Sequence, residues 1–176
     1  MAVFYFIRHG QMNFSLANKK IYQGRGLDLL TLSELGRQQI KAAAQDDRLK
    51  AARLILSSPF GRTLHSAAIL SKELGLEIRV ETDLYEWRAD AVDFAWLPDE
   101  EAERRYQALT DNRGHHPDGQ TPAWESAEQM KARVYAVLDR YKDCPCVIVV
   151  CHGTLMQYVL GIPHPKNGQI AVLEYE

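Results

Sequence analysis

Short continuous runs of apolar residues alternate along the chain with longer stretches in which the apolar residues have helical spacing. Continuous runs such as VFYFI at 3–7 and CVIVV at 146–150 are typical of strands buried on both faces. Strands are predicted at residues 2–7, 53–57, 76–80, 146–151 and 169–175. Helices are predicted at 33–47, 60–74, about 125–141 and 153–160, the first capped by Ser33 and the second and fourth ended by Gly75 and Gly161.

Strands that alternate with helices predict an α/β fold, a three-layer α/β/α sandwich with helices on both faces of a mostly parallel central sheet. No repeat, low-complexity tract or linker divides the 176 residues, so we expect a single domain over 1–176. The acidic residues of 83–103 and the polar residues of 110–123 interrupt the alternation. Because ligands of open α/β sheets bind outside the carboxyl ends of the strands, an insertion at about 81–124 is expected to fold over that edge as a small lid.

Charge and hydropathy exclude some classes of partner. The chain has 21 Lys and Arg against 23 Asp and Glu, a net charge of -2, so neither nucleic acid nor a membrane surface is predicted as a partner. No apolar stretch approaches the ~20 residues that span a bilayer. No basic residue precedes the short apolar run at 2–7, as it would in a secretory signal. A cytoplasmic protein is therefore expected.

Three cysteines, Cys144, Cys146 and Cys151, lie close together next to His152. Their odd number does not suggest a disulfide framework. A zinc site is the alternative, but a CxC followed by CH lacks the paired CxxC spacing of structural zinc sites. Buried thiols in and beside a core strand are the favoured interpretation, and no metal or cofactor is predicted.

Chemically useful residues stand at the ends of three predicted strands. The first ends in Arg8-His9-Gly10, the second leads through Ser57-Ser58-Pro59 to Arg62, and the third ends in His152-Gly153-Thr154. If these strands are parallel neighbours, two arginines and two histidines meet at one edge and repel one another unless an anion binds there. The planar guanidinium group of arginine suits phosphate. The amides of Gly153 and Thr154 open a predicted helix, and the N-terminus of a helix favours anions. A phosphoryl site is therefore predicted.

The ordered set of RHG at 8–10, SSPFGR at 57–62 and HG at 152–153 resembles the histidine phosphatase (phosphoglycerate-mutase-like) superfamily, phosphatase branch. Further matches cover nearly the whole chain: Gln23-Gly24, LSELGRQQ at 32–39, DLYEW at 83–87 and Glu125-Ser126. No P-loop, GxGxxG or Gly-x-Ser-x-Gly elbow offers other machinery for phosphate or for a nucleophile.

The resemblance implies covalent catalysis through a phosphohistidine on His9, with its other ring nitrogen held by a backbone carbonyl. Arg8, Arg62 and His152 would bind the phosphoryl oxygens. Glu86 would act as general acid and base, and its competitors for this role are Asp83, Asp90 and Asp93. The expected substrate contacts are Arg8, Arg62, Gln23, Gly24, Gly153, Thr154 and, as a hypothesis for a second anionic group, Arg88.

The sequence departs from the family pattern just after the nucleophile. The family typically has Glu followed by Ser or Thr after RHG, and then a Trp-Asn pair. Here Gln11-Met12 and Phe14-Ser15 hold these positions. Asn13 and Asn18 are the candidates for the amide contact to phosphate that the pattern lacks.

A metal-independent phosphomonoester hydrolase is the resulting prediction, with a small phosphorylated metabolite or inorganic phosphate as its partner. Family mutases are longer and carry larger insertions that exclude water, which favours hydrolysis in 176 residues. A phosphohistidine protein phosphatase and a mutase are the alternative enzymes. A phosphate-binding scaffold on the same fold is the alternative outside enzymes.

Overall fold

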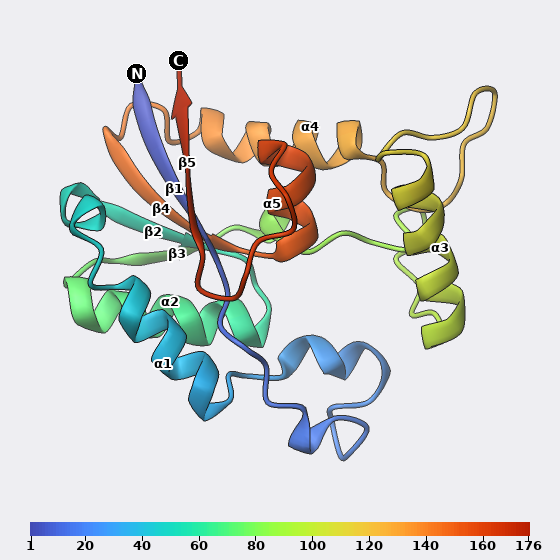
Figure 1. The fold of residues 1–176 in the computed structure, drawn as a ribbon, viewed down its shortest axis with the longest axis horizontal. Coiled ribbons are helices and arrows are strands. Elements are labelled where there is room, and N and C mark those ends of the chain that lie inside the picture. The colour runs from blue at the N-terminus through green and yellow to red at the C-terminus, as the bar shows by residue number, and fades with distance from the viewer.

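The computed structural model describes residues 1–176 and contains one five-stranded sheet (Figure 1). The strand order is β3-β2-β4-β1-β5. The four parallel strands are β1 (Ala2–Arg8), β2 (Leu54–Ser57), β3 (Ile78–Val80) and β4 (Cys146–Cys151). The last strand, β5 (Ile170–Tyr175), is antiparallel to β1, which brings the two chain termini together (Figure 1). The predicted mostly parallel sheet is confirmed.

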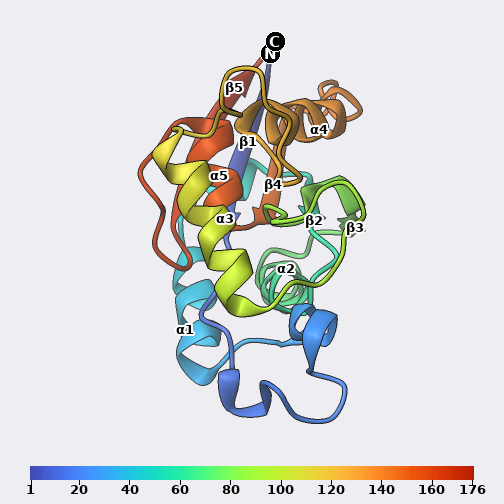
Figure 2. The same cartoon turned by 90° about the vertical axis from the view of Figure 1, so that its right-hand side faces the viewer.

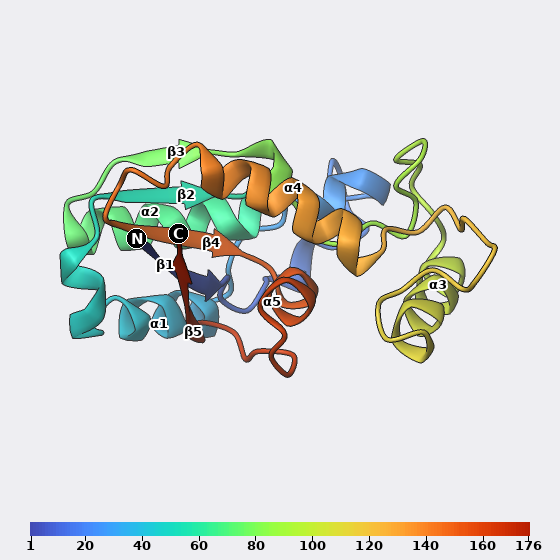
Figure 3. The ribbon, with the colours of Figure 1, turned by 90° about the horizontal axis from the view of Figure 1, so that it is seen from above.

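Helices cover both faces of the sheet, so the predicted three layers are also confirmed (Figure 3). On one face lie α1 (Glu34–Ala43) and α2 (Gly61–Leu74), and on the other α4 (Ala127–Asp139) and α5 (Gly153–Leu160). Every residue of β4 is buried, because this strand is central and covered on both faces. Its continuous apolar run follows from that position.

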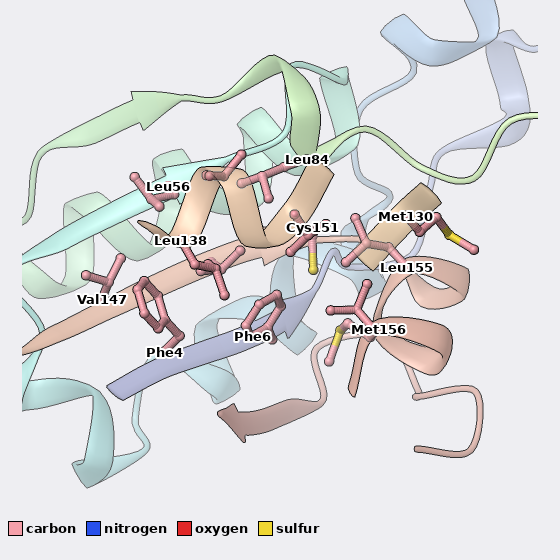
Figure 4. Close-up of a cluster of buried hydrophobic side chains, with 14 of the residues drawn as sticks. Phe4, Phe6, Leu56, Leu84, Met130, Leu138, Val147, Cys151, Leu155 and Met156 are labelled. Carbon is pink, nitrogen blue, oxygen red and sulfur yellow. The ribbon is translucent and has the colours of Figure 1, made fainter. Parts of the chain in front are cut away.

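The core has two parts, one on each face of the sheet. Phe4 and Phe6 of β1 point towards α4 and α5, where they lie among Leu138, Leu155 and Met156 (Figure 4). On the opposite face, alternate residues of the same strands pack with α1 and α2 in a second buried cluster that includes Ile7, Ile148, Ile40 and Leu70. Burial of side chains on both faces holds the carboxyl ends of β1, β2 and β4 in fixed relative positions.

The predicted caps Ser33, Gly75 and Gly161 each lie at the end of a helix. Ser33 accepts a hydrogen bond from the amide of Gly36 at 3.1 Å, and Ser126 forms a capping box with Gln129. Gly75 ends α2 with a positive φ of 71°, a conformation that glycine adopts without strain. The first helix is shorter than predicted, because it ends at Ala43 and residues 47–51 form a separate 3₁₀ turn. No helix combines the length and apolar character that crossing a membrane requires.

Residues 81–124 contain a helix that the sequence pattern did not predict, α3 (Asp99–Asp111). The helix is mostly polar, and only Leu109 is fully buried, but three acids in its first turn stabilise the start. Arg105 anchors the helix by donating to the carbonyl of Ala89 at 2.8 Å. The helix lies on the side of the molecule towards which the carboxyl ends of the parallel strands point (Figures 1 and 2).

Candidate active site

His9 follows β1 directly and is only 6% exposed. Its amide donates to the carbonyl of Cys151 at 3.0 Å, and its carbonyl accepts from the side chain of Asn167 at 2.8 Å. The ring Nδ1 lies 2.8 Å from the carbonyl oxygen of Gly10. Because a carbonyl only accepts, Nδ1 carries the hydrogen and Nε2 keeps its lone pair. The contact is the one that the family resemblance predicts.

The ring of His9 is neutral near pH 7. Burial, with Arg62 and Arg8 as positive neighbours, lowers the pKa of His9 to about 3. A neutral imidazole with a free Nε2 is a nucleophile over the whole physiological pH range.

The low pKa of His9 predicts a stability that depends on pH. Native His9 stays unprotonated down to pH about 3, whereas unfolded histidine takes up its proton near pH 6.5. The contribution of neutral His9 to stability is therefore complete above pH 6.5 and is lost as the pH falls towards 3. Urea titrations between pH 4 and 7 are expected to show a free energy of unfolding that falls by up to about 1.4 kcal/mol per pH unit more steeply in the wild type than in His9→Gln. Equal slopes would contradict the assigned protonation.

His152 precedes α5 and is fully buried beside Arg62. Arg62 Nε lies 3.3 Å from its Nδ1, and Ser58 Oγ lies 2.7 Å from its Nε2. A guanidinium only donates, so Nδ1 accepts and the neutral ring donates from Nε2 to the serine. Burial, with Arg62 and His9 nearby, lowers the pKa of His152 well below its usual value. The ring thus supports Arg62, and the phosphate contact that the resemblance implies would require one of these two bonds to open.

Arg8 and Arg62 direct positive charge towards His9. Arg8 Nη1 donates to the carbonyl of Pro165 at 2.5 Å, while its Nε is buried without a partner. Burial lowers the pKa of both arginines, and the carboxylate of Glu86 opposes this effect in each. Both guanidinium groups stay charged, because the pKa of arginine starts far above neutrality.

These groups line one cavity of about 350 Å³, here called the phosphate cavity. It lies between the ends of the central strands and the segment that follows His9. Its lining residues are Arg8, His9, Met12, Phe14, Leu27, Asp28, Leu30, Arg62 and Glu86. Of the strand-end residues predicted to meet, Arg8, His9 and Arg62 line this cavity together with Glu86. His152 does not line it but lies next to it, with its ring centroid 5.4 Å from that of His9.

Glu86 reaches the cavity from the segment after β3, where backbone amides fix its carboxylate. It accepts from its neighbour Trp87 at 2.8 Å, from Leu155 at 3.0 Å and from Thr154 at 3.2 Å. The competing acids lie elsewhere: Asp83 is exposed, Asp90 accepts three amides of its own loop, and Asp93 is exposed. None of the three lines the phosphate cavity.

The amides that open α5 differ from the expected arrangement. The sequence predicted that the amides of Gly153 and Thr154 would bind the anion, but Thr154 and Leu155 donate to Glu86 instead. The α5 N-terminus is thus already satisfied by a carboxylate of the protein. Gly153 packs so closely against Arg8 that an added Cβ would lie 3.1 Å from the guanidinium carbon. Its small size gives the arginine room.

A buried ion pair holds the segment that carries Glu86. Arg133 on α4 donates to both carboxylate oxygens of Glu125, at 2.5 and 2.9 Å, with side chains only 10% and 3% exposed. The same guanidinium donates to the carbonyls of Asp83 and Tyr85. Charged hydrogen bonds of this kind are strong in buried surroundings, so Glu86 is presented from a rigid support.

Arg88 is paired rather than free. Its Nη1 and Nη2 each lie 3.3 Å from Oδ2 of Asp28, whose Oδ1 lies 3.3 Å from Nη1 of Arg62. The guanidinium carbons of both arginines lie over the ring of Phe60, 4.7 and 4.8 Å from its centroid. Asp28 and Phe60 carried no signal in the sequence, because each reads as an ordinary residue of a turn or helix start.

Several predicted contacts lie outside the phosphate cavity. The side chain of Gln23 donates back to the carbonyl of Lys20, and Gly24 lines a neighbouring cavity. Asn13 caps a short 3₁₀ helix by accepting from the amide of Ser15, and Asn18 does not line the cavity. The departures from the family pattern place apolar Met12 and Phe14 in the wall instead.

The cysteines lie in the core, and their sulfurs are free thiols. Cys146 and Cys151 are buried in β4, and Cys144 is half-buried. Burial raises the pKa of the Cys151 thiol, which disfavours the thiolate that metal binding requires.

Comparisons with known proteins agree with this fold. The model of the histidine phosphatase superfamily (branch 1) matches residues 4–167. A probable phosphoglycerate mutase GpmB of Photorhabdus laumondii is 29% identical over 169 residues, 90% of this chain and 75% of that protein.

Two solved structures share the fold. A mycobacterial glucosyl-3-phosphoglycerate phosphatase in complex with VO3 superposes with a TM-score of 0.69 at 24% identity, covering 99% of this chain and 91% of that one. YhfR of Bacillus stearothermophilus has a TM-score of 0.72 at 21% identity, covering 100% and 92%. With a family model that spans nearly the whole chain and the arrangement of His9, Arg8, Arg62 and His152 described above, the protein belongs to the histidine phosphatase superfamily, branch 1.

Proposed function

We propose that this protein is a metal-independent phosphomonoesterase that works through a phosphohistidine on His9. The observation that carries the proposal is the unprotonated Nε2 of His9 in a cavity shared with Arg8, Arg62 and Glu86. The guanidinium groups supply the positive charge that a transferred phosphoryl group needs. The cavity size suits a small molecule.

The reaction would proceed in two transfers. In the first, Nε2 forms a bond to phosphorus while the bond from phosphorus to the ester oxygen breaks, and Glu86 gives its proton to the departing alcohol. In the second, Glu86 takes a proton from water as the water oxygen bonds to phosphorus and the bond to Nε2 breaks. Inorganic phosphate leaves, and His9 and Glu86 return to their starting states.

Mutase activity is the second candidate, because the relative described above is named a probable phosphoglycerate mutase. A mutase transfers the phosphoryl group to a second hydroxyl and must exclude water. The phosphatase among the structural neighbours favours hydrolysis as the working proposal. Incubation with 3-phosphoglycerate separates the two activities, since a phosphatase releases inorganic phosphate and a mutase produces an isomer.

Hydrolysis of p-nitrophenyl phosphate in excess EDTA tests the proposal. We expect turnover between pH 5 and 8 that EDTA does not reduce, because arginines supply the positive charge. The matched assay without EDTA is the control. Loss of activity in EDTA would contradict metal independence. No turnover of this ester or of a panel of sugar phosphates and phosphohistidine peptides would favour the phosphate-binding scaffold.

A further inference from the structure

Asp28 stands between the phosphate cavity and a second cavity of about 250 Å³, here called the outer cavity. Both cavities are lined by Leu27 and Asp28. Glu86 lines the first, and the next two residues of the chain, Trp87 and Arg88, line the second. Because Glu86 is placed to protonate the departing oxygen, the alcohol part of an ester would extend along this segment into the outer cavity.

The charges around Asp28 balance with one phosphate. Arg8, Arg62 and Arg88 carry three positive charges, and the Asp28 carboxylate, in contact with two of them, neutralises one. The two that remain are matched by a phosphate dianion even before the Glu86 carboxylate is counted. Arg25 also lines the outer cavity, but it is exposed to solvent, and Asp90 and Asp99 line the same cavity. A second anionic group on the substrate would therefore meet no net positive charge there, and it would lie close to the Asp28 carboxylate.

The outer cavity suits an uncharged, hydroxyl-bearing group. Trp87 and Trp96 supply aromatic walls, and Trp96 lies over Gly24, where an added Cβ would be 3.7 Å from the indole. Asp28 and Arg88 supply an acceptor and a donor at the boundary with the phosphate cavity. Aromatic surface with a few polar groups is typical of sites for neutral polar molecules.

We propose that Asp28 is a specificity-determining residue that restricts the enzyme to phosphate monoesters of uncharged alcohols, whose alcohol part occupies the outer cavity. The inference rests on the proposed phosphatase function and names its substrate class. The sequence suggested that Arg88 binds a second anionic group of the substrate. In the present proposal Arg88 can do so only when the Asp28 carboxylate no longer neutralises the Arg88 guanidinium.

Two esters with the same carbon skeleton test the proposal. Glycerol 3-phosphate ends in a neutral CH2OH group where 3-phosphoglycerate has a carboxylate. We expect the wild type to have the higher kcat/KM for glycerol 3-phosphate. In Asp28→Asn the ratio of the two kcat/KM values should shift about tenfold towards 3-phosphoglycerate, the effect of one elementary charge near the second anion. Asp28→Glu, which keeps the charge, should keep the wild-type preference.

A double-mutant cycle assigns the gain to Arg88. Combining Asp28→Asn with Arg88→Ala should remove the shift, because no guanidinium is then released for the carboxylate. Asp93→Asn, an exposed charge change in the same insertion, is the matched control and should leave the ratio unchanged. Circular dichroism spectra of the variants serve to check that each one is folded.

Calorimetric binding of both esters to His9→Ala, with and without Asp28→Asn, gives the same ratio from dissociation constants and needs no turnover. If the ratio of dissociation constants shifts as predicted but the wild type hydrolyses neither ester, the phosphatase function is contradicted and the role of Asp28 is not. An unchanged ratio in folded Asp28→Asn would overturn the role of Asp28. A wild-type preference for 3-phosphoglycerate would overturn the proposed substrate class, and failure of both esters to bind would overturn both proposals.

Discussion

Replacing His9 with alanine is expected to lower kcat for p-nitrophenyl phosphate by at least about a thousandfold, because the substitution removes the atom that accepts the phosphoryl group. The other parts of the site would stay in place: Arg8 is held by Pro165, and Arg62 by His152 and Asp28. Phosphate binding should therefore survive the loss of turnover. Steady-state kinetics and calorimetry with inorganic phosphate measure the two properties separately.

A covalent intermediate gives a second readout for the same substitution. Wild-type protein quenched in alkali during turnover is expected to carry one phosphoryl group, stable to base and labile to acid as phosphohistidine is. The His9→Ala protein should carry none. His115→Ala is the matched control, because this histidine is exposed in the loop before α4 and pairs only with Glu128. Equal activity in wild type and His9→Ala would exclude the histidine mechanism.

Replacing Glu86 with glutamine is expected to lower kcat/KM for an alkyl ester such as glycerol 3-phosphate by about 10² to 10⁴, the usual contribution of a positioned general acid. Glutamine has the size of the glutamic acid side chain, and its single oxygen can still accept from the amide of Leu155, although the hydrogen bond from Thr154 to the second oxygen is lost. Arg133 continues to hold the segment through the carbonyls of Asp83 and Tyr85. The segment should therefore keep its conformation while the transferable proton is lost.

The leaving group distinguishes general acid catalysis from a structural role for Glu86. The p-nitrophenolate group departs readily without a proton, so kcat/KM for its ester should fall much less than for glycerol 3-phosphate. Asp83→Asn, an exposed acid in the same segment, is the matched control and should change neither value by more than about twofold, as for most exposed substitutions. Equal losses for both esters in Glu86→Gln would contradict the assigned proton transfer.

Much of the fold could be predicted from local patterns. All five strands were predicted, β1 and β4 from continuous apolar runs, and Ser33, Gly75 and Gly161 located three helix ends, because these signals depend on neighbours along the chain. The helix at 99–111 was missed because it has few apolar residues. Its residues are mostly polar, and it is held by contacts between segments, such as that of Arg105 with Ala89, which a local pattern does not show.

The meeting of Arg8, His9, Arg62 and His152 could also be predicted, since each follows a strand that the pattern places in one parallel sheet. The carboxyl ends of such strands share an edge, and therefore strand position alone brings these residues together. The hydrogen-bond partners of His152 could not be predicted in the same way. His152 donates to Ser58 and accepts from Arg62, which depends on side-chain packing behind the edge.

The sheet, the helices that cover it and the residues at the carboxyl ends of its strands could be predicted from the amino-acid sequence. Only the tertiary structure decided which partner each charge has: Glu86 occupies the N-terminus of α5 from 68 and 69 residues away, and Asp28 bridges Arg62 and Arg88 across 34 and 60 residues. Local sequence signals act over a few positions, whereas an ion pair depends on distance in space. The charge balance that selects the substrate is therefore a property of the folded protein.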